Sequence, residues 1–207
     1  NKKSIVNQRE IGNDASDLTV ALKNALRQAP DCILIGEIRD KETMSAALAY
    51  AQSGHLVVAT LHANNSYQAL TRVINFYPIE NRQSLLADLS SSLRAIVSQR
   101  LVSAIDGKRR AAVEVMLNTR HIAELIEQGE IALIKEAIEK SLSPGSQTFE
   151  QALMQLIKDG VVTQDEALAH ADSASNLFWL LNNSAQAVEE EAPEQEEASF
   201  TEFTLKM

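Results

Sequence analysis

Cysteine, glycine, proline and long apolar runs are all scarce in this sequence. Its single cysteine excludes an internal disulfide framework, which fits a reducing compartment. Seven Gly and four Pro among 207 residues leave few breaks, so helix should dominate. No apolar run reaches the roughly 20 residues that span a bilayer, and no signal peptide opens the chain. We therefore expect a helix-rich protein of the cytoplasm.

The sequence also lacks a dense group of basic residues. The formal net charge is −9, and residues 184–207 hold seven Glu against one Lys, so the preceding chain is nearly balanced. Without a basic stripe, we expect no sequence-independent binding of nucleic acid. Residues 184–207 contain few apolar side chains before Phe200 and are predicted to be a disordered acidic tail.

The most informative stretch is 31–40, which reads DCILIGEIRD. Its apolar run, Cys32–Ile35, lies between Pro30 and Gly36 and is too short for a helix, so it predicts a fully buried strand of a parallel sheet. Ligands of open α/β sheets bind beyond the carboxyl ends of the strands. Glu37 and Arg39 would lie there, and a carboxylate so placed can orient water for in-line attack on a phosphoryl group. The alternative is a strand followed by a solvated, charged turn.

A second strand is predicted one helix later. Residues 41–53 have helical apolar spacing and end at Gly54, and residues 55–61 form another short apolar run. Two strands joined by a helix form a βαβ unit, so they should be parallel. His62 would then lie at the ligand edge, whereas His55 stands at the opposite end of the strand and points to the other face. For each histidine, a hydrogen-bonded structural role is the alternative.

The remaining chain is predicted to contain a long helix, a hairpin and a helical region. A leucine stripe predicts one helix over residues 80–102, and apolar segments around Asp106-Gly107 predict a hairpin over 101–117. The helices predicted after it are 121–128, 131–140, 149–158, 164–170 and 176–181. We therefore divide the chain into a core (1–118), a helical subdomain (119–183) and the tail.

Two segments resemble the secretion-type AAA+-like ATPases, the hexameric motors of type II secretion and type IV pili. Residues 26–40 end in the G-E-I/M-R-D form of their atypical Walker B motif, and residues 53–65 carry a His box of two histidines seven apart. Other segments resemble the pilus retraction branch, PilT and PilU: 7–12, 72–78, 97–101 and 147–153. Residues 111–119 are PilU-like. The resemblance implies an α/β fold, with the C-terminal part of a RecA-like P-loop NTPase core followed by a small helical subdomain.

The resemblance also implies roles for individual residues. Glu37 matches the catalytic glutamate, and Gly36 stands where most P-loop ATPases carry the Walker B aspartate. His62 and His55 form the His box, which is tied to phosphate sensing and subunit coupling. The other nucleotide-binding residues implied are Arg9 and Arg39. The implied cofactors are ATP and Mg²⁺, and we expect no separate metal site.

The phosphate-binding motif G-x-x-x-x-G-K-S/T is absent from the 207 residues. Its backbone amides, its lysine and its Mg²⁺-binding hydroxyl are therefore missing as well. The family places this motif, and most Mg²⁺ ligands, upstream of the segments matched here. We expect the chain to be the C-terminal part of a longer motor, and this part alone to hydrolyse no ATP.

The leading hypothesis is a PilU-like retraction ATPase that drives pilus retraction and twitching motility. The resemblance implies a cytoplasmic homo-hexamer, peripheral at the inner membrane, with a PilT-like ATPase and an inner-membrane pilus platform protein as partners. The alternative is a non-autonomous adaptor that modulates a PilT-like motor, because residues 121–126 read HIAELI where PilT carries an AIRNLI-type motif. A type II secretion or pilus-assembly ATPase is disfavoured, since those usually carry a four-cysteine zinc element.

Overall fold

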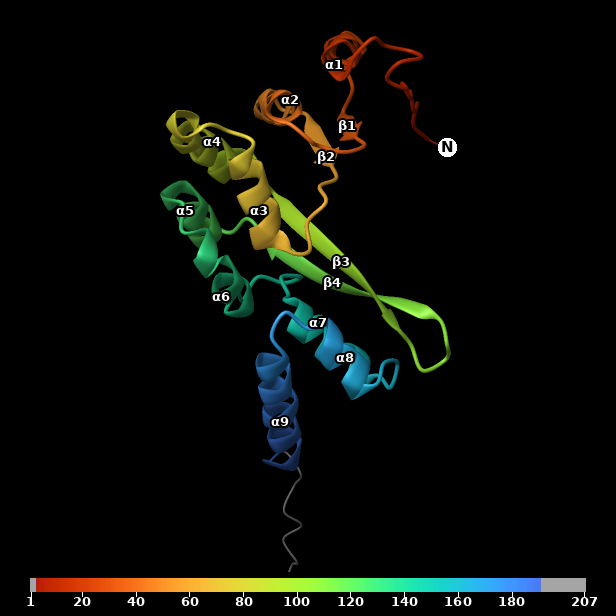
Figure 1. Cartoon of the computed structure of the whole chain (residues 1–207), viewed down its shortest axis with the longest axis vertical. Coiled ribbons are helices and arrows are strands. Elements are labelled where there is room, and N and C mark those ends of the chain that lie inside the picture. The colour runs from red at the N-terminus through yellow and green to blue at the C-terminus, as the bar shows by residue number, and fades with distance from the viewer. Residues whose placement is uncertain (1–2, 191–207) are drawn as a thin grey trace, which may run out of the picture.

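The first part of the chain is an α/β unit. The computed structural model describes residues 3–190. The unit contains, in order, α1 (Leu18–Leu26), β1 (Cys32–Ile35), α2 (Lys41–Gln52), β2 (Leu56–Ala59) and α3 (Ser66–Asn75). It lies at one end of an elongated molecule, and the C-terminal helices lie at the other end (Figure 1).

Strands β1 and β2 are parallel neighbours, which confirms the prediction from the βαβ pattern. Their register pairs Ile35 with Ala59, so both strands end at the same edge. Between them, α2 begins where the Asp40 carboxylate accepts a hydrogen bond from the Thr43 amide at 2.8 Å. The chain leaves α2 through Gly54, whose φ of +97° is readily adopted only by glycine. The cap at Asp40 and the turn at Gly54 thus set the two ends of α2, and β2 begins shortly after the turn.

Only one face of this two-stranded sheet is buried. Ile33 and Ile35 are 6% and 2% exposed, whereas Leu34 is 73% exposed. On β2, Leu56 and Val58 are exposed as well. The prediction of a fully buried strand is therefore wrong for β1. Side chains of α1 and α2 join the cluster that covers one face, and no segment within residues 3–190 buries the other.

A helix and a long hairpin follow α3. They are α4 (Ile79–Ser92), β3 (Ala95–Ser103) and β4 (Arg109–Leu117). The two strands pair antiparallel along their whole length, and the hairpin extends away from the α/β unit (Figure 1). The predicted helix over 80–102 is wrong beyond Ser92. Leu93 adopts extended backbone with ψ of 140°, and the residues after it alternate between the faces of a strand.

Helices make up the rest of the described chain. They are α5 (Arg120–Gln128), the 3₁₀ turn η1 (Ile131–Leu133), α6 (Ile134–Glu139), α7 (Phe149–Lys158), α8 (Gln164–His170) and α9 (Ala174–Glu190). This confirms the prediction of a helical region. None of the helices within residues 3–190 is both long enough and apolar enough to cross a bilayer.

The last helix corrects the predicted start of the acidic tail. Helix α9 continues to Glu190, so residues 184–190 are helical rather than disordered. Alanine and glutamine at 185–187 are strong helix formers, and they carry the helix into the Glu-rich segment. Residues 191–207, the rest of the predicted tail, lie outside the described residues.

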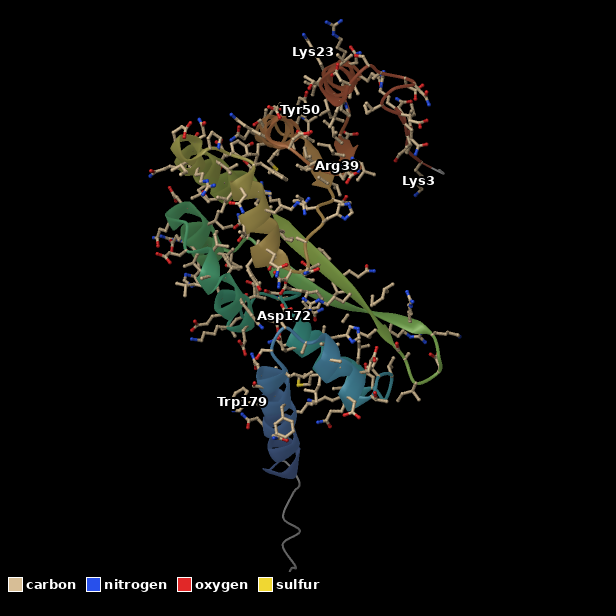
Figure 2. The ribbon with its side chains drawn as sticks, in the orientation of Figure 1. Lys3, Lys23, Arg39, Tyr50, Asp172 and Trp179 are labelled. Carbon is tan, nitrogen blue, oxygen red and sulfur yellow. The ribbon has the colours of Figure 1, made fainter. Side chains whose placement is uncertain are left out.

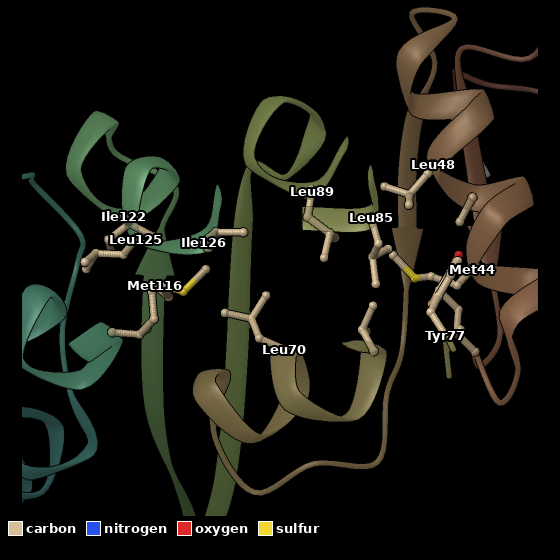
Figure 3. Close-up of a cluster of buried hydrophobic side chains, with 14 of the residues drawn as sticks. Met44, Leu48, Leu70, Tyr77, Leu85, Leu89, Met116, Ile122, Leu125 and Ile126 are labelled. Atoms are coloured by element: carbon tan, nitrogen blue, oxygen red, sulfur yellow. The ribbon is translucent and has the colours of Figure 1, made fainter. Parts of the chain in front are cut away.

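Two hydrophobic clusters hold these elements together. The larger joins α1–α6 and includes Leu70, Leu85, Leu89, Met116, Ile122 and Ile126 (Figure 3). The smaller packs α7–α9 against the hairpin through Val102, Ala112, Phe149, Leu153 and Leu177. The packing thus changes after α6. The division into a core (1–118) and a helical subdomain (119–183) stays a prediction.

Candidate functional site

The carboxyl ends of β1 and β2 form the candidate site. Each strand leads into a loop, residues 36–40 after β1 and residues 60–65 after β2. The Ile38 amide donates to the Thr60 carbonyl oxygen at 2.9 Å, and the Thr60 hydroxyl donates to the Gly36 carbonyl oxygen. These bonds continue the parallel pairing beyond the strands, so side chains from both loops meet.

Glu37 contacts a different side chain with each carboxylate oxygen. Its Oε2 lies 3.1 Å from Nε2 of His62, and its Oε1 forms an ion pair with the Arg39 guanidinium. Hydrogen bonding to Arg39, helped by His62, holds the pKa of Glu37 below its ordinary value in spite of some desolvation. The carboxylate therefore stays ionised at neutral pH and can accept a hydrogen bond or a proton. Figure 2 shows Arg39 beside β1 and β2.

Two other predicted residues lie away from this contact. His55 is at the start of β2, where its Nδ1 lies 3.0 Å from the Ser53 hydroxyl and 3.2 Å from the Tyr50 carbonyl oxygen. Its ring meets the Tyr50 ring edge-on. Arg9 lies on an exposed segment before α1, and within residues 3–190 it forms no ion pair with Glu37. Nucleotide-binding roles for His55 and Arg9 stay predictions.

Two residues that the sequence does not mark as functional, Thr60 and Arg72, also shape the site. Thr60 joins the two loops through the Gly36 carbonyl. Arg72, on α3, donates from Nη1 to the His62 carbonyl oxygen at 2.9 Å and so fixes the backbone beneath the imidazole. The sequence places Arg72 on a helix that follows the His62 loop, but helical spacing does not say that this helix folds back over the loop.

A carboxylate, an imidazole and a guanidinium together suit a hydrolytic reaction at phosphorus. The carboxylate can orient water, and the other two groups can donate to anionic oxygens. Within residues 3–190, no group of three His, Cys, Asp or Glu side chains is arranged to hold a metal ion. The phosphate-cradling motif is absent from the sequence. The residues present thus fit the part of a nucleotide site that activates water. The part that binds the phosphates is not among them.

Comparison with known proteins gives consistent matches. The family model described as Type II/IV secretion system protein matches residues 2–169. The type IV pilus ATPase PilU of Pseudomonas aeruginosa is 54% identical over 178 residues, which are 86% of this chain and 47% of PilU. The type IV pilus retraction ATPase PilT of the same organism is 39% identical over 176 residues, which are 85% of this chain and 51% of PilT.

A solved structure shows the same arrangement of elements. The crystal structure of the pilus retraction motor PilT with bound ADP is 36% identical and gives a TM-score of 0.78, over 86% of this chain and 50% of that one. The predicted α/β ATPase fold and the resemblance based on the Walker B and His-box segments are thereby confirmed. The chain spans about half the length of the curated relatives it matches.

Proposed function

The chain belongs to the type II/IV secretion system protein family, and on this basis we propose that the whole protein is an ATPase that drives the retraction of type IV pili. The observation that carries the proposal is the contact between Glu37 and His62, where two parallel strands end side by side. A carboxylate and an imidazole meet there in a chain similar to PilU and PilT. Pilus retraction would in turn support twitching motility.

Each residue at the strand ends has a role in the proposed reaction. Bound ATP, with Mg²⁺, supplies the terminal phosphoryl group that passes to water. Glu37 orients this water and takes up its proton. His62 reports on the terminal phosphate, because its exposed imidazole reaches both Glu37 and the space beyond the strands. Arg39 keeps Glu37 ionised. Gly36 leaves the approach open, since no residue other than its two chain neighbours has an atom within 4 Å of where its Cβ would be.

Two further residues are proposed to act away from Glu37. His55 lies at the other end of β2, a position that suits contact with a neighbouring subunit. Arg9 lies on an exposed segment, a position that suits approach to the nucleotide in the assembled protein.

The uncovered face of β1 and β2 supports a RecA-like core that another segment of the protein completes. Leu34, Leu56 and Val58 present apolar surface on a sheet of only two strands. Apolar surface and unpaired strand edges of this kind are normally covered. We propose that the P-loop half of the core packs here, and that it supplies the phosphate cradle and most Mg²⁺ ligands.

The proposed assembly is a homo-hexamer in the cytoplasm, peripheral at the inner membrane. The matched PilT structure is described as a pilus retraction motor, and a motor of this kind must pass the result of hydrolysis to its neighbours. We propose that the helical region after residue 118 moves during hydrolysis. A PilT-like ATPase and an inner-membrane pilus platform protein are the proposed partners. We propose no nucleic-acid partner, because the charge of the body is nearly balanced.

The substitution Glu37→Gln tests the proposed function in the whole protein. It keeps the size of the side chain and removes the base, so phosphate release at saturating ATP should fall about a hundredfold or more. The control is Glu136→Gln, which removes an exposed carboxylate from its pair with Lys140 and should keep wild-type turnover.

Two results would contradict the proposal. Equal turnover of Glu37→Gln and wild type would remove Glu37 from the reaction. A wild-type protein that is inactive alone but accelerates a PilT-like ATPase would establish the adaptor alternative.

A further inference from the structure

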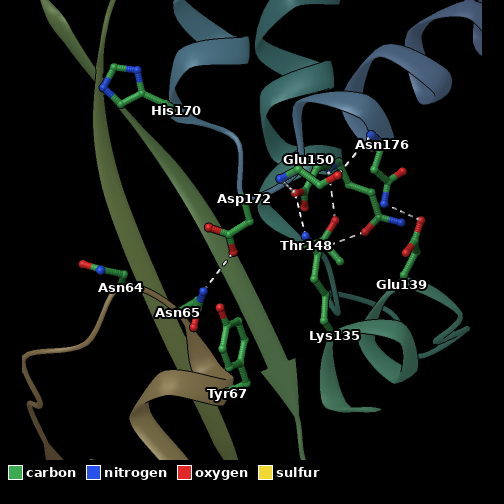
Figure 4. Close-up of polar contacts among 12 residues, drawn as sticks. Asn64, Asn65, Tyr67, Lys135, Glu139, Thr148, Glu150, His170, Asp172 and Asn176 are labelled. Atoms are coloured by element: carbon green, nitrogen blue, oxygen red, sulfur yellow. Dashed lines mark hydrogen bonds and ion pairs between the residues drawn. The ribbon is translucent and has the colours of Figure 1, made fainter. Parts of the chain in front are cut away.

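Asn65 links the His62 loop to a distant part of the chain. Its side chain is buried, with only 1% of the residue exposed. Oδ1 accepts a hydrogen bond from the Gln68 amide at 3.0 Å and so caps α3. Nδ2 donates to Oδ2 of Asp172 at 2.9 Å, across 107 positions of sequence (Figure 4). The residue that ends the His62 loop is therefore bound directly to the connection between α8 and α9.

Arg100, on β3, strengthens the same link. Its guanidinium forms an ion pair with Asp172 and donates to the carbonyl oxygens of Asn64 at 3.2 Å and His170 at 2.8 Å. It also lies over the Phe149 ring, 4.0 Å from the centroid. The side chains of Arg100 and Asp172 are only 19% and 15% exposed, so water and salt screen this pair less than a surface pair. One guanidinium thus holds the loop, the hairpin and the C-terminal helices together.

The His62 loop is held at its other boundaries as well. Arg72 fixes the His62 carbonyl, and the Ser66 amide at the start of α3 donates to Oε1 of Glu114 at 2.7 Å. Glu114 is 2% exposed, and burial raises the pKa of its carboxyl. With both ends fixed, residues 62–65 have little freedom, and the position of His62 depends on all of these bonds.

Asp172 also adjoins the first turn of α9. The next residue, Ser173, donates its amide to Oε1 of the buried Glu150 at 2.8 Å, and Asn176 donates from Nδ2 to Oε1 of Glu139 at 3.1 Å (Figure 4). Since α9 begins within two residues of Asp172, a displacement of Asp172 would also displace the start of α9. Figure 2 shows Asp172 at the junction between the hairpin and the C-terminal helices, well away from Arg39.

We propose that Asp172 and Arg100 are positioning residues for His62. They bind the loop at Asn64 and Asn65, hold His62 against Glu37, and connect the loop to the start of α9. A change at the hydrolytic site that moves this loop thereby also moves the C-terminal helices. The inference rests on the proposed function, because that function gives His62 its role.

Three variants of the whole protein test the link. Asn65→Asp keeps an oxygen to cap α3, loses the donor to Asp172 and places two carboxylates together. Asp172→Asn removes the carboxylate. The double variant N65D/D172N restores a hydrogen bond with donor and acceptor exchanged. The matched control is Asp106→Asn, which breaks another Asp–Arg pair, with Arg110 at 2.9 Å, at the tip of the hairpin.

Two measurements are made on each variant: hydrogen exchange of the amides in residues 62–66, and kcat and KM for ATP. Each single variant should speed exchange about tenfold or more, because a hydrogen bond to a charged group is lost. Each should lower kcat by about tenfold to a hundredfold through misplacement of His62, with KM little changed. The double variant should recover both quantities in part, and D106N should change neither.

The results separate this proposal from the proposed function. Unchanged exchange in D172N overturns the anchoring of the loop, whatever happens to turnover. Faster exchange with wild-type kcat overturns the positioning role and leaves only a structural link. If the wild-type protein hydrolyses no ATP, the proposed function and the positioning role in hydrolysis fail together, while exchange still decides the anchoring.

Discussion

Glu37 is held by two groups that affect it in different ways. Arg39 neutralises one oxygen and lowers the pKa of the carboxyl, whereas His62 meets the other oxygen at 3.1 Å. These two partners occupy two of the roughly four lone-pair sites of the carboxylate, so in the proposed reaction the water that loses its proton to Glu37 binds at one of the others. Water reaches these sites because the side chains of Arg39 and His62 are 71% and 76% exposed.

Substitution of Arg39 should change the pH dependence of the site. The guanidinium lowers the pKa of Glu37 below the ordinary value of 4.5, so Arg39→Gln should raise it. A base with a higher pKa loses its charge at a higher pH. The acid limb of ATP turnover should therefore move to higher pH in the variant. Carboxyl-carbon NMR titration of Glu37 and the pH profile of hydrolysis measure the two effects.

Arg120→Gln serves as the control for this prediction. It removes an exposed arginine that pairs with Glu124 at 2.9 Å and lies on α5, so neither the titration of Glu37 nor the pH profile should change. A titration of Glu37 that is identical in Arg39→Gln and wild type would show that the ion pair does not form in solution.

The meeting of Glu37 and His62 can be predicted from the sequence, but the residues that support them cannot. Both follow short apolar runs, and parallel neighbours end at one edge of a sheet. The bonds from Arg72 and Arg100 depend instead on how α3 and the hairpin pack, which no local pattern specifies. Asp172 lies in a segment whose sequence indicates only a break between helices.

Among the elements, α7 shows most clearly how local sequence fixes a helix end. Thr148 and Gln151 form a reciprocal capping box, with bonds of 3.3 Å to Thr148 Oγ1 and 2.9 Å to Gln151 Oε1. The first residue of the helix is the fully buried Phe149, whose ring lies under Arg100. Because Phe149 directly follows the cap, the cap fixes the position of the ring on which Arg100 packs.

Loss of this cap should destabilise the protein measurably. Thr148→Ala leaves the amide of Gln151 without its acceptor in a buried place, and the free energy of unfolding should fall by about 1–2 kcal/mol. Urea denaturation followed by circular dichroism gives the value. Thr71→Ala, on the exposed middle of α3, is the control and should change stability by less than about 0.5 kcal/mol. Equal losses in the two variants would contradict the capping argument.

The boundary between α4 and β3 shows where element prediction fails. Apolar residues at helical spacing continue through Leu93 and Ile96, so periodicity alone predicts one helix. Three serines at 90–92 have weak helix propensity, and the following segment is rich in β-branched residues that suit a strand. Pairing with β4 then decides the outcome, because the strand gains its partner only through the hairpin.

For the whole molecule, the uncovered face of β1 and β2 leads to a solution test. This 207-residue chain, studied by itself, should bind the dye ANS through Leu34, Leu56 and Val58. Leu34→Thr should lower the bound dye, because it removes the most exposed of the three side chains that form the continuous apolar surface. Leu142→Thr changes a 98% exposed leucine outside this face and should have a smaller effect. Equal ANS binding by the whole protein would contradict a covering segment.

At this scale the α/β class and the helical region follow from the sequence, whereas the packing does not. Apolar periodicity predicts each helix from α5 to α8, but it does not show that α5 and α6 join the larger cluster while α7 to α9 join the hairpin. That choice depends on complementary shapes of surfaces far apart in the chain.

The separation of Asn65 and Asp172 has a consequence for synthesis. Translation releases the chain from its amino end, so the His62 loop leaves the ribosome long before Asp172 exists, 107 positions later. Closing so large a loop costs entropy, and contacts of this range form late in folding. The loop consequently reaches its final geometry only after residue 172 has been synthesised. Nascent and truncated chains that lack residue 172 retain Glu37 and His62 but lack the bond from Asn65 to Asp172.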